Sequence, residues 1–354
     1  MNSIVKILSW RDWGIVRYNS IFQNLSALYF IAYVGLHWNL TFIVNSLLFI
    51  FFSILMTGYG YLINDFADID LDKHHQKPNS FANTKKSLAI WILLGVLICG
   101  AIFSLPFIKN IWFVIIWGIW IFVATTYSLP PLRFKEKGTL GLITTVLGQQ
   151  VLPVALLFAA FTTPWSWGVF ILILFTFSRG VSSDLGHQIR DWINDSQTDT
   201  CTFAVKIGYK NANSIYMTCL EFERIILGLV LMVFWYYFPK VGLSRLGLQI
   251  SWILPLVLVY ITLIIKTLGS SWRAWRRGNL EQNDPYDEVR QHGRFDSLHI
   301  IHHTFPTVVM PFYLASTITL IYLPNFIFIL IIILVFNLYR FDLWKRFISY
   351  WFNK

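Results

Sequence analysis

Charged side chains are scarce in this sequence. Asp, Glu, Lys and Arg make up 13% of the 354 residues, whereas about 25% is usual in a soluble domain. Because hydrophobic residues make up 56%, most of the chain is expected to avoid water, which excludes a soluble globular protein. The net charge of +10 does not indicate nucleic-acid binding, because the basic residues lie in short loops between apolar runs.

Cysteine is rare as well. Cys99, Cys201 and Cys219 show no Cys-x-x-Cys spacing, so neither a disulfide framework nor a zinc site is indicated. The first 16 residues lack an apolar run followed by a small-residue cleavage site. We therefore expect no removable signal peptide and assign membrane insertion to the first apolar helix.

Long apolar runs dominate the rest of the sequence. A membrane-spanning helix needs about 20 mostly apolar residues, and ten stretches separated by prolines and polar loops meet this condition. The predicted spans are residues 20–37, 41–63, 88–107, 110–127, 140–161, 165–183, 213–238, 250–268, 304–323 and 325–341. The sequence thus predicts an all-α polytopic membrane protein that forms a single transmembrane domain over residues 1–354.

The distribution of Lys and Arg predicts the orientation, because basic loops stay on the cytoplasmic side. With a cytoplasmic N-terminus, the only basic residues in loops on the opposite, non-cytoplasmic side are Lys109, Lys240 and Arg245. The basic C-terminal tail then lies inside, which requires an even number of spans. We expect both termini, the acidic segments described next and the polar loop 270–303 to be cytoplasmic.

Eight of the 18 Asp and Glu residues gather in two segments, at residues 64–72 and 184–199. The first segment reads NDFADIDLD from residue 64. On a continuous helix Asn64, Asp68 and Asp72 are four residues apart and share one face, and Asp65 joins them through i+3 spacing. Charge near a bilayer is costly, so such residues usually mark a functional site.

The second segment reads DLGHQIRDWIND from residue 184. Asp184, Gln188, Asp191 and Asp195 form one stripe on a helix. Two carboxylate stripes with few local counter-charges repel each other when empty, and Mg²⁺ relieves this repulsion through carboxylates and substrate phosphates. The pattern therefore predicts a diphosphate bridged by Mg²⁺ between the segments, although solvated charges at helix ends are the simpler alternative.

Basic residues near these segments complete an anion site. Arg133, Lys135 and Lys137 follow the sequence YSLPP, and Lys77 and Arg190 are further candidates for diphosphate binding.

These motifs resemble those of the UbiA superfamily of membrane prenyltransferases. NDFADIDLD is similar to the family's NDxxDxxxD motif, Asp191 and Asp195 match its DxxxD pair, and YSLPPLRFKEKG is similar to its Tyr-Ser/Pro…Lys/Arg loop. The resemblance covers residues 15–325, and residues 325–354 would add a further helix and a basic tail. It implies a ring of nine helices around a central cavity, with a tenth helix appended.

The resemblance also implies site residues and a reaction. One Mg²⁺ would be held by Asn64, Asp65, Asp68 and Asp72, and another by Asp191 and Asp195; the stripe adds Asp184 to the metal ligands. Arg133, Lys135 and Tyr127 would lie near the diphosphate. The implied reaction moves a prenyl group from a polyprenyl diphosphate to a small-molecule or lipid acceptor within membrane lipids, with Asp191 and Tyr127 as the expected catalytic residues.

The acceptor stays open at this point. An aromatic or quinone precursor is favoured, and a sugar- or polyol-phosphate is the alternative. A cation-coupled transporter would place carboxylates near the middle of the membrane and repeat its halves. This sequence instead places its acids at predicted helix ends and shows no clear repeat, so transport ranks below prenyl transfer.

Overall fold

The computed structural model describes residues 24–74, 77–197, 200–243, 248–276 and 299–352. The described chain is helical apart from its turns and one two-stranded sheet. The beginning of the first predicted span and residues 277–298 of the predicted polar loop lie outside the described residues.

The chain packs as two compact units. Unit 1 comprises residues 1–22, 41–164 and 179–216, and unit 2 comprises residues 23–40, 165–178 and 217–354. Both acidic segments and the basic loop between them belong to unit 1. The single-domain organisation and the nine-helix ring stay predictions.

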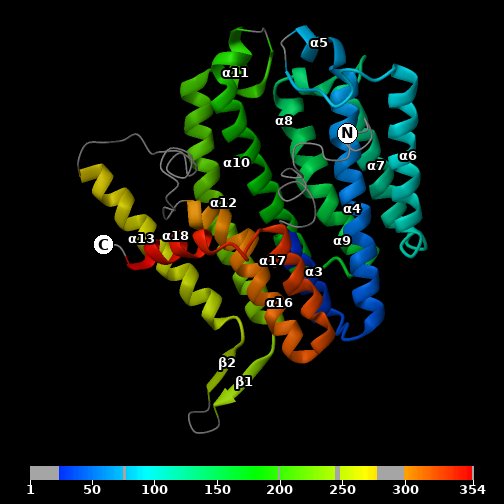
Figure 1. Cartoon of the computed structure of the whole chain (residues 1–354). Helices are drawn as coiled ribbons and strands as arrows, with labels where there is room; N and C mark the ends of the chain where they lie inside the picture. The colour runs from blue at the N-terminus through cyan, green and yellow to red at the C-terminus, as the bar shows by residue number, and fades with distance from the viewer. Residues whose placement is uncertain (1–23, 75–76, 198–199, 244–247, 277–298, 353–354) are drawn as a thin grey trace. The chain divides into compact units, whose positions relative to one another are not determined.

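Unit 1 contains the helices of both acidic segments and those packed around them. They are α4 (Leu40–Ala67), α5 (Ile69–His74), α6 (Lys86–Ser104), α7 (Ile111–Ser128), η3 (Phe134–Glu136), α8 (Thr139–Val146), η4 (Leu147–Val151), α9 (Leu152–Ala160), the second half of α10 (Trp167–Gln197), α11 (Phe203–Ile207) and the start of α12 (Tyr209–Tyr237). In Figure 1, α5, the start of α8 and α11 lie at the same end of this unit.

Close packing inside unit 1 depends on a cap and on one glycine. The Asn110 side chain caps α7 by accepting from the Trp112 amide, and its Nδ2 donates to the Ala159 carbonyl at 2.7 Å. This ties the beginning of α7 to the end of α9. Where α10 crosses α8 and η4, a Cβ on Gly180 would lie only 2.8 Å from the Val146 side chain, so the approach requires glycine.

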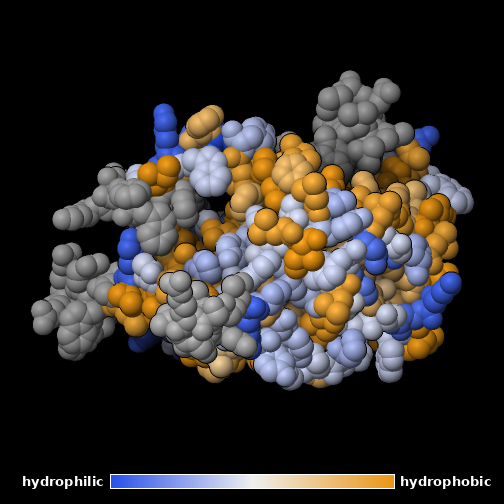
Figure 2. Space-filling view, turned by 90° about the horizontal axis from the view of Figure 1, so that it is seen from below, coloured by the Kyte–Doolittle hydropathy of each residue, from blue (hydrophilic) through white to orange (hydrophobic). Residues whose placement is uncertain are grey.

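Within the described residues, the helices are long and apolar enough to cross a membrane at six places, judged by length and composition. One of them, α6, exposes Leu88, Trp91, Ile98 and Ile102, and hydrophobic residues cover much of the face shown in Figure 2. Such apolar surface is costly in water and suits lipid. These features confirm an integral, multi-pass membrane protein, whereas the predicted total of ten spans stays unconfirmed.

Unit 2 contains the remaining elements. They are α3 (Leu25–Val34), the first half of α10, most of α12, β1 (Lys240–Leu243), β2 (Leu248–Ser251), α13 (Leu254–Arg276), η5 (Ile300–Val309), α16 (Met310–Ile321), η6 (Leu323–Asn325), α17 (Phe326–Val335) and α18 (Phe341–Phe352). Its core includes edge-to-face ring pairs between Tyr29 and Phe328 and between Phe30 and Tyr237.

Two details of unit 2 differ from the sequence prediction. β1 and β2 form an antiparallel hairpin with Lys240 opposite Ser251, where the sequence predicted only a loop. The helix of the predicted tenth span, α17, has ten residues and therefore rises about 15 Å, roughly half of the hydrocarbon thickness. A short turn then separates it from α18.

Candidate functional site

The first acidic segment continues one helical face across the end of α4. Although α4 ends at Ala67 and α5 begins at Ile69, the Asp68 amide donates to the Asn64 carbonyl and the Asp72 amide donates to the Asp68 carbonyl, at 3.1 and 2.8 Å. These bonds keep the helical i to i−4 pattern through the junction. The shared face of Asn64, Asp68 and Asp72 predicted from the sequence is therefore present.

Asp68 is neutralised by two cations from the loop that follows α7. The Arg133 guanidinium donates from Nη2 to Oδ1 at 2.9 Å, and the Lys135 ammonium makes a short bond to Oδ2. Asp68 is buried, and charge-assisted bonds are strongest where water is excluded. The sequence predicted basic residues here, but it did not predict that they saturate this carboxylate directly.

The conformation of the loop after α7 directs the side chains of Arg133 and Lys135 toward α4. Arg133 has a positive φ of 37°, which is strained for a residue other than glycine. Its Nε donates to the Glu136 carboxylate at 2.6 Å, which holds the guanidinium in place. The Asn64 Oδ1 accepts from Lys135 Nζ at 3.2 Å and from Ser128 Oγ at 2.9 Å. Asn64 is thus part of the same network.

Asp65 and Asp72 are held by two residues that the sequence analysis did not assign to the site. Ser80 donates to Asp65 Oδ2 from its hydroxyl at 2.5 Å and from its amide at 3.1 Å. Asn79 Nδ2 donates to Asp72 Oδ2 at 2.8 Å and to the Asp65 carbonyl at 2.7 Å. Their only sequence signal was the Pro-Asn-Ser turn at Pro78.

The second acidic segment lies on one unbroken helix, α10, as predicted. Gln188 donates from Nε2 to Asp184 Oδ2 at 2.8 Å, and its Oε1 accepts from the Ala204 amide at 3.1 Å. Gln188 therefore joins this helix to α11. Burial raises the pKa of Asp195, and the neighbouring Asp191 carboxylate adds to the rise, while Thr202 and Lys77 oppose it.

The loop after α7 connects the two acidic segments. Its Gly138 amide donates to the Cys201 carbonyl at 3.0 Å, and Gly138 pairs with Thr202 beyond the end of α10. Lys77, which follows the first segment, lies within electrostatic range of Asp195 in the second. Segments that are more than 100 residues apart in sequence thus meet at one end of unit 1.

Tyr127 lies between the two segments. Its hydroxyl is hydrogen-bonded to Thr145, and it lies within electrostatic range of Asp68 from the first segment and of Asp184 and Asp195 from the second. The sequence placed Tyr127 near a diphosphate by resemblance alone. Its location puts it within electrostatic range of both acidic stripes.

The donor set suits Mg²⁺ only in partnership with a ligand. Among the described residues, no three His, Cys, Asp or Glu side chains gather closely enough to hold a metal ion on their own. Carboxylate and amide oxygens such as those of Asn64, Asp72 and the exposed Asp191 are ligands that Mg²⁺ prefers. Because Mg²⁺ usually binds one or two carboxylates together with substrate phosphates, the residues fit the ion. The binding role of Arg190 stays a prediction.

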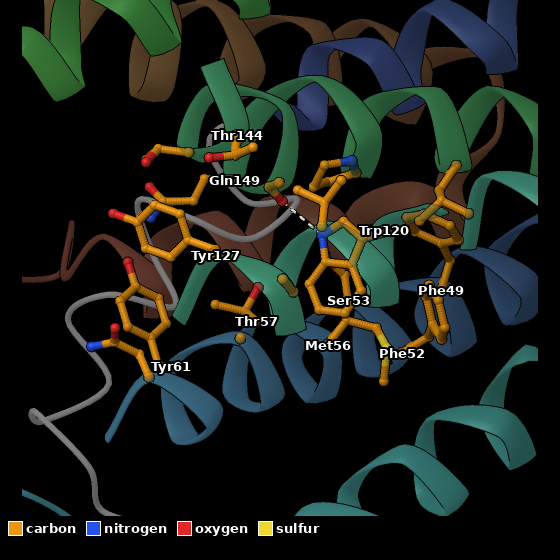
Figure 3. Close-up of a pocket in the computed structure, with 18 residues that line it drawn as sticks. Phe49, Phe52, Ser53, Met56, Thr57, Tyr61, Trp120, Tyr127, Thr144 and Gln149 are labelled. Atoms are coloured by element: carbon orange, nitrogen blue, oxygen red, sulfur yellow. Dashed lines mark hydrogen bonds between the residues drawn. The ribbon is translucent and has the colours of Figure 1, made fainter. Parts of the chain in front are cut away.

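A cavity opens beside this network. Its empty volume is about 950 Å³, part of it open to the outside, and it is lined by residues of α4, α7, α8, η4 and α9. Asn64 and Tyr127 lie at its polar end, and Phe49 and Phe52 lie at the far end, as Figure 3 shows for the three aromatic residues. The cavity therefore runs from the acidic network into the apolar interior of unit 1.

Comparison with known proteins agrees with this geometry. No curated protein matches the chain in sequence. Three solved structures of a UbiA homologue from Archaeoglobus fulgidus share its fold. The structure bound to DMAPP and Mg²⁺ has a TM-score of 0.54 at 14% identity and covers 85% of this chain and 98% of its own. The structure bound to GPP and Mg²⁺ has a TM-score of 0.51 at 15% identity, with coverage of 84% and 98%.

The third structure, described without a ligand, has a TM-score of 0.54 at 15% identity and covers 89% of this chain and 100% of its own. The profile of the UbiA prenyltransferase family matches residues 25–284, which include both acidic segments and the basic loop. This chain belongs to the UbiA prenyltransferase family.

Proposed function

We propose that this protein transfers a prenyl group from a prenyl diphosphate to an acceptor at the acidic network of unit 1, with Mg²⁺. The observation that carries the proposal is that two acidic helix ends lie within electrostatic range of Tyr127, and that the first of them is bonded to Arg133 and Lys135. Family membership supports the reaction class, and the related archaeal structures bound to DMAPP or GPP with Mg²⁺ support the donor class.

The basic loop would hold the leaving group. Arg133 and Lys135 are the cations closest to the first segment, and both can bond to diphosphate oxygens in place of Asp68. Mg²⁺ would neutralise the charge that grows on the departing diphosphate. Asn64, Asp65, Asp68 and Asp72 would hold one Mg²⁺, and Asp184, Asp191 and Asp195 would hold another.

In the transfer step, the bond between C1 of the prenyl group and the diphosphate oxygen breaks, and the diphosphate leaves with the electron pair. The acceptor forms the new bond to C1 and loses a proton. Asp191, which is exposed at the helix surface, is the residue we assign to orient the acceptor or take this proton. Tyr127, which lies between the two acidic stripes, would stabilise the charge that develops in the transition state.

The proposal is tested with purified protein, labelled prenyl diphosphates and a panel of acceptors, scored by Mg²⁺-dependent diphosphate release. Asp68→Ala and Asp191→Ala should abolish release while the protein still inserts into membranes. Asp70→Ala is the matched control, because Asp70 lies in the same segment but is exposed, and its carboxylate pairs with Lys86 at 3.4 Å. Full activity of both site variants, or activity that persists when a chelator removes Mg²⁺, contradicts the mechanism.

We further propose the orientation and helix count inferred from the sequence: both termini and both acidic segments on the cytoplasmic side, and a nine-helix ring with a tenth helix. Cysteine accessibility tests the orientation. A single cysteine at position 85, in the loop before α6, should react with a membrane-impermeant maleimide only from the cytoplasmic side, and a cysteine at Lys109 only from the opposite side.

A further inference from the structure

The cavity of unit 1 contains no charged side chain. Among its 18 lining residues there is no Asp, Glu, Lys, Arg or His. An anionic group placed inside would lose its water without gaining a counter-charge, which is strongly unfavourable. The cations Arg133 and Lys135 lie outside this lining, in the network with Asp68. The cavity therefore selects against carboxylates and phosphates.

The cavity is nevertheless polar at one side. Thr57, Tyr61 and Gln149 bring hydroxyl and amide groups to its wall, and Figure 3 shows Gln149 beside Thr144 near the ring of Tyr127. Gln149 makes no side-chain hydrogen bond to any other residue that the structure describes. Its amide can donate two hydrogen bonds and accept others, so it offers unused capacity to a ligand.

The backbone around Gln149 is itself unusual. It belongs to η4, a π-helical turn between α8 and α9 that is followed by Pro153. Such turns within α-helices are frequently found at functional sites, and a proline in the helix removes one amide donor. The turn leaves the Gly148 carbonyl able to accept from Trp120 Nε1 at 2.6 Å. One π-helical turn thus places both the free amide and a fixed indole on the cavity wall.

Aromatic side chains form other parts of the cavity wall. Trp120 is held by its bond to Gly148, and its ring faces Gly60 of α4, where a Cβ would lie in ordinary van der Waals contact at 3.8 Å. At the far end, Phe49 and Phe52 are 2% and 1% exposed and pack against further rings. Flat aromatic walls favour a planar ligand through offset or edge-to-face contacts.

We propose that this cavity binds the acceptor, and that the acceptor is an uncharged ring compound whose oxygen substituent bonds to Gln149. This inference rests on the proposed prenyl transfer. A prenyl tail would fill the apolar end equally well, but it would leave the Gln149 amide without a partner. A sugar- or polyol-phosphate would bring an uncompensated charge into the cavity.

Binding to the purified protein tests the inference without turnover. The probes are methyl para-hydroxybenzoate, its anionic parent para-hydroxybenzoate, uncharged menadione, glycerol phosphate, and farnesyl diphosphate with Mg²⁺. We expect at least one uncharged ring to bind, and the methyl ester to bind at least about tenfold more tightly than the anion. Binding of neither uncharged ring, or equal binding of ester and anion, overturns the inference.

Three variants locate the ligand. Gln149→Met keeps the size of the side chain but removes a neutral hydrogen bond. It should therefore weaken the binding of the uncharged rings by about two- to tenfold and leave the binding of farnesyl diphosphate unchanged. Gln149→Lys should reverse the preference toward the anion. Thr126→Val, on α7 but outside the cavity lining, is the control and should change neither the affinity for the rings nor the affinity for farnesyl diphosphate.

The outcomes separate two failures. If Gln149→Met weakens the binding of farnesyl diphosphate as much as the binding of the rings, the prenyl tail occupies the cavity and the acceptor assignment is wrong. If the wild-type protein does not bind farnesyl diphosphate in the presence of Mg²⁺, the proposed prenyl transfer fails, whatever the rings do.

Discussion

Replacing Lys135 by methionine should have opposite effects on the two ligands of the acidic network. The ammonium of Lys135 bonds to Asp68 Oδ2 while Arg133 bonds to Oδ1, so both oxygens of this predicted metal ligand are already engaged. Mg²⁺ that arrives alone must displace a cation from Asp68. A diphosphate that arrives alone must draw the same cation away from its carboxylate.

The magnitude follows from the bond that is lost. The side chains of Lys135 and Asp68 are 16% and 9% exposed, so the bond is partly shielded from water. A hydrogen bond to a charged group contributes about 1.5–3 kcal/mol, or a factor of about ten to a hundred in a dissociation constant. Lys135→Met should tighten the binding of Mg²⁺ alone and weaken the binding of diphosphate alone, each within this range.

The assay is titration of purified protein with Mn²⁺ as a spectroscopic substitute for Mg²⁺, and separately with inorganic diphosphate. Lys137→Met is the matched control, because Lys137 lies in the same loop but is exposed, with its ammonium 5.4 Å from the centre of the Phe134 ring. Unchanged metal affinity in Lys135→Met, or weakened affinity for both ligands, would refute the idea that Lys135 competes with the metal for Asp68.

Three further predictions concern the same network. Burial lowers the pKa of Lys135; Asp68 opposes this effect and Arg133 adds to it. Lys135 therefore loses its proton at a lower pH than an ordinary lysine, and the affinity for diphosphate should fall as the pH rises on the alkaline side. Lys135→Arg should shift that fall to higher pH because the guanidinium stays charged. An identical pH profile for both proteins contradicts this. Ser80→Ala removes the 2.5 Å bond to the buried Asp65 carboxylate and should lower the free energy of unfolding by about 1–3 kcal/mol, measured by thermal unfolding in detergent, whereas an unchanged melting temperature argues against a structural role of this bond. Gly138→Ala should destabilise by about 1–2 kcal/mol because Gly138 has a φ of +54°, and Gly148→Ala, at a helical glycine whose Cβ would meet ordinary contact at 3.4 Å, should cost less in the same measurement.

Helical periodicity was the part of the site that the sequence could predict. The four-residue spacing of Asn64, Asp68 and Asp72 needs only a continuous helix, and the backbone bonds across the junction of α4 and α5 supply it. The nearness of Arg133 and Lys135 to this face followed from their charge and from the family resemblance. Periodicity and charge are properties of a local segment, so they can be inferred without coordinates.

The remaining contacts depend on tertiary geometry. Asn79 and Ser80 are ordinary turn residues in the sequence, and only the return of their loop onto α4 turns them into partners of Asp72 and Asp65. The sequence also gives no sign of the π-helical turn at Gln149, because one extra residue per turn does not change the composition of the segment. The short α17 also escaped prediction, since apolar composition alone does not determine where a helix ends.

The charge distribution of unit 1 offers a physical route to keep two substrates apart. Arg133, Lys135 and Asp68 lie together in the acidic network, whereas the adjoining cavity is lined only by uncharged side chains. A diphosphate gains counter-charges in the network and would lose them in the cavity, so it stays at the polar end. An uncharged ring loses little on passing inward and gains contacts with Trp120 and Gln149. If both proposals hold, the charged network ends and the uncharged cavity begins at Asn64 and Tyr127. The diphosphate is stable only on the charged side and the ring only on the uncharged side, so C1 of the donor would lie next to the acceptor at this position.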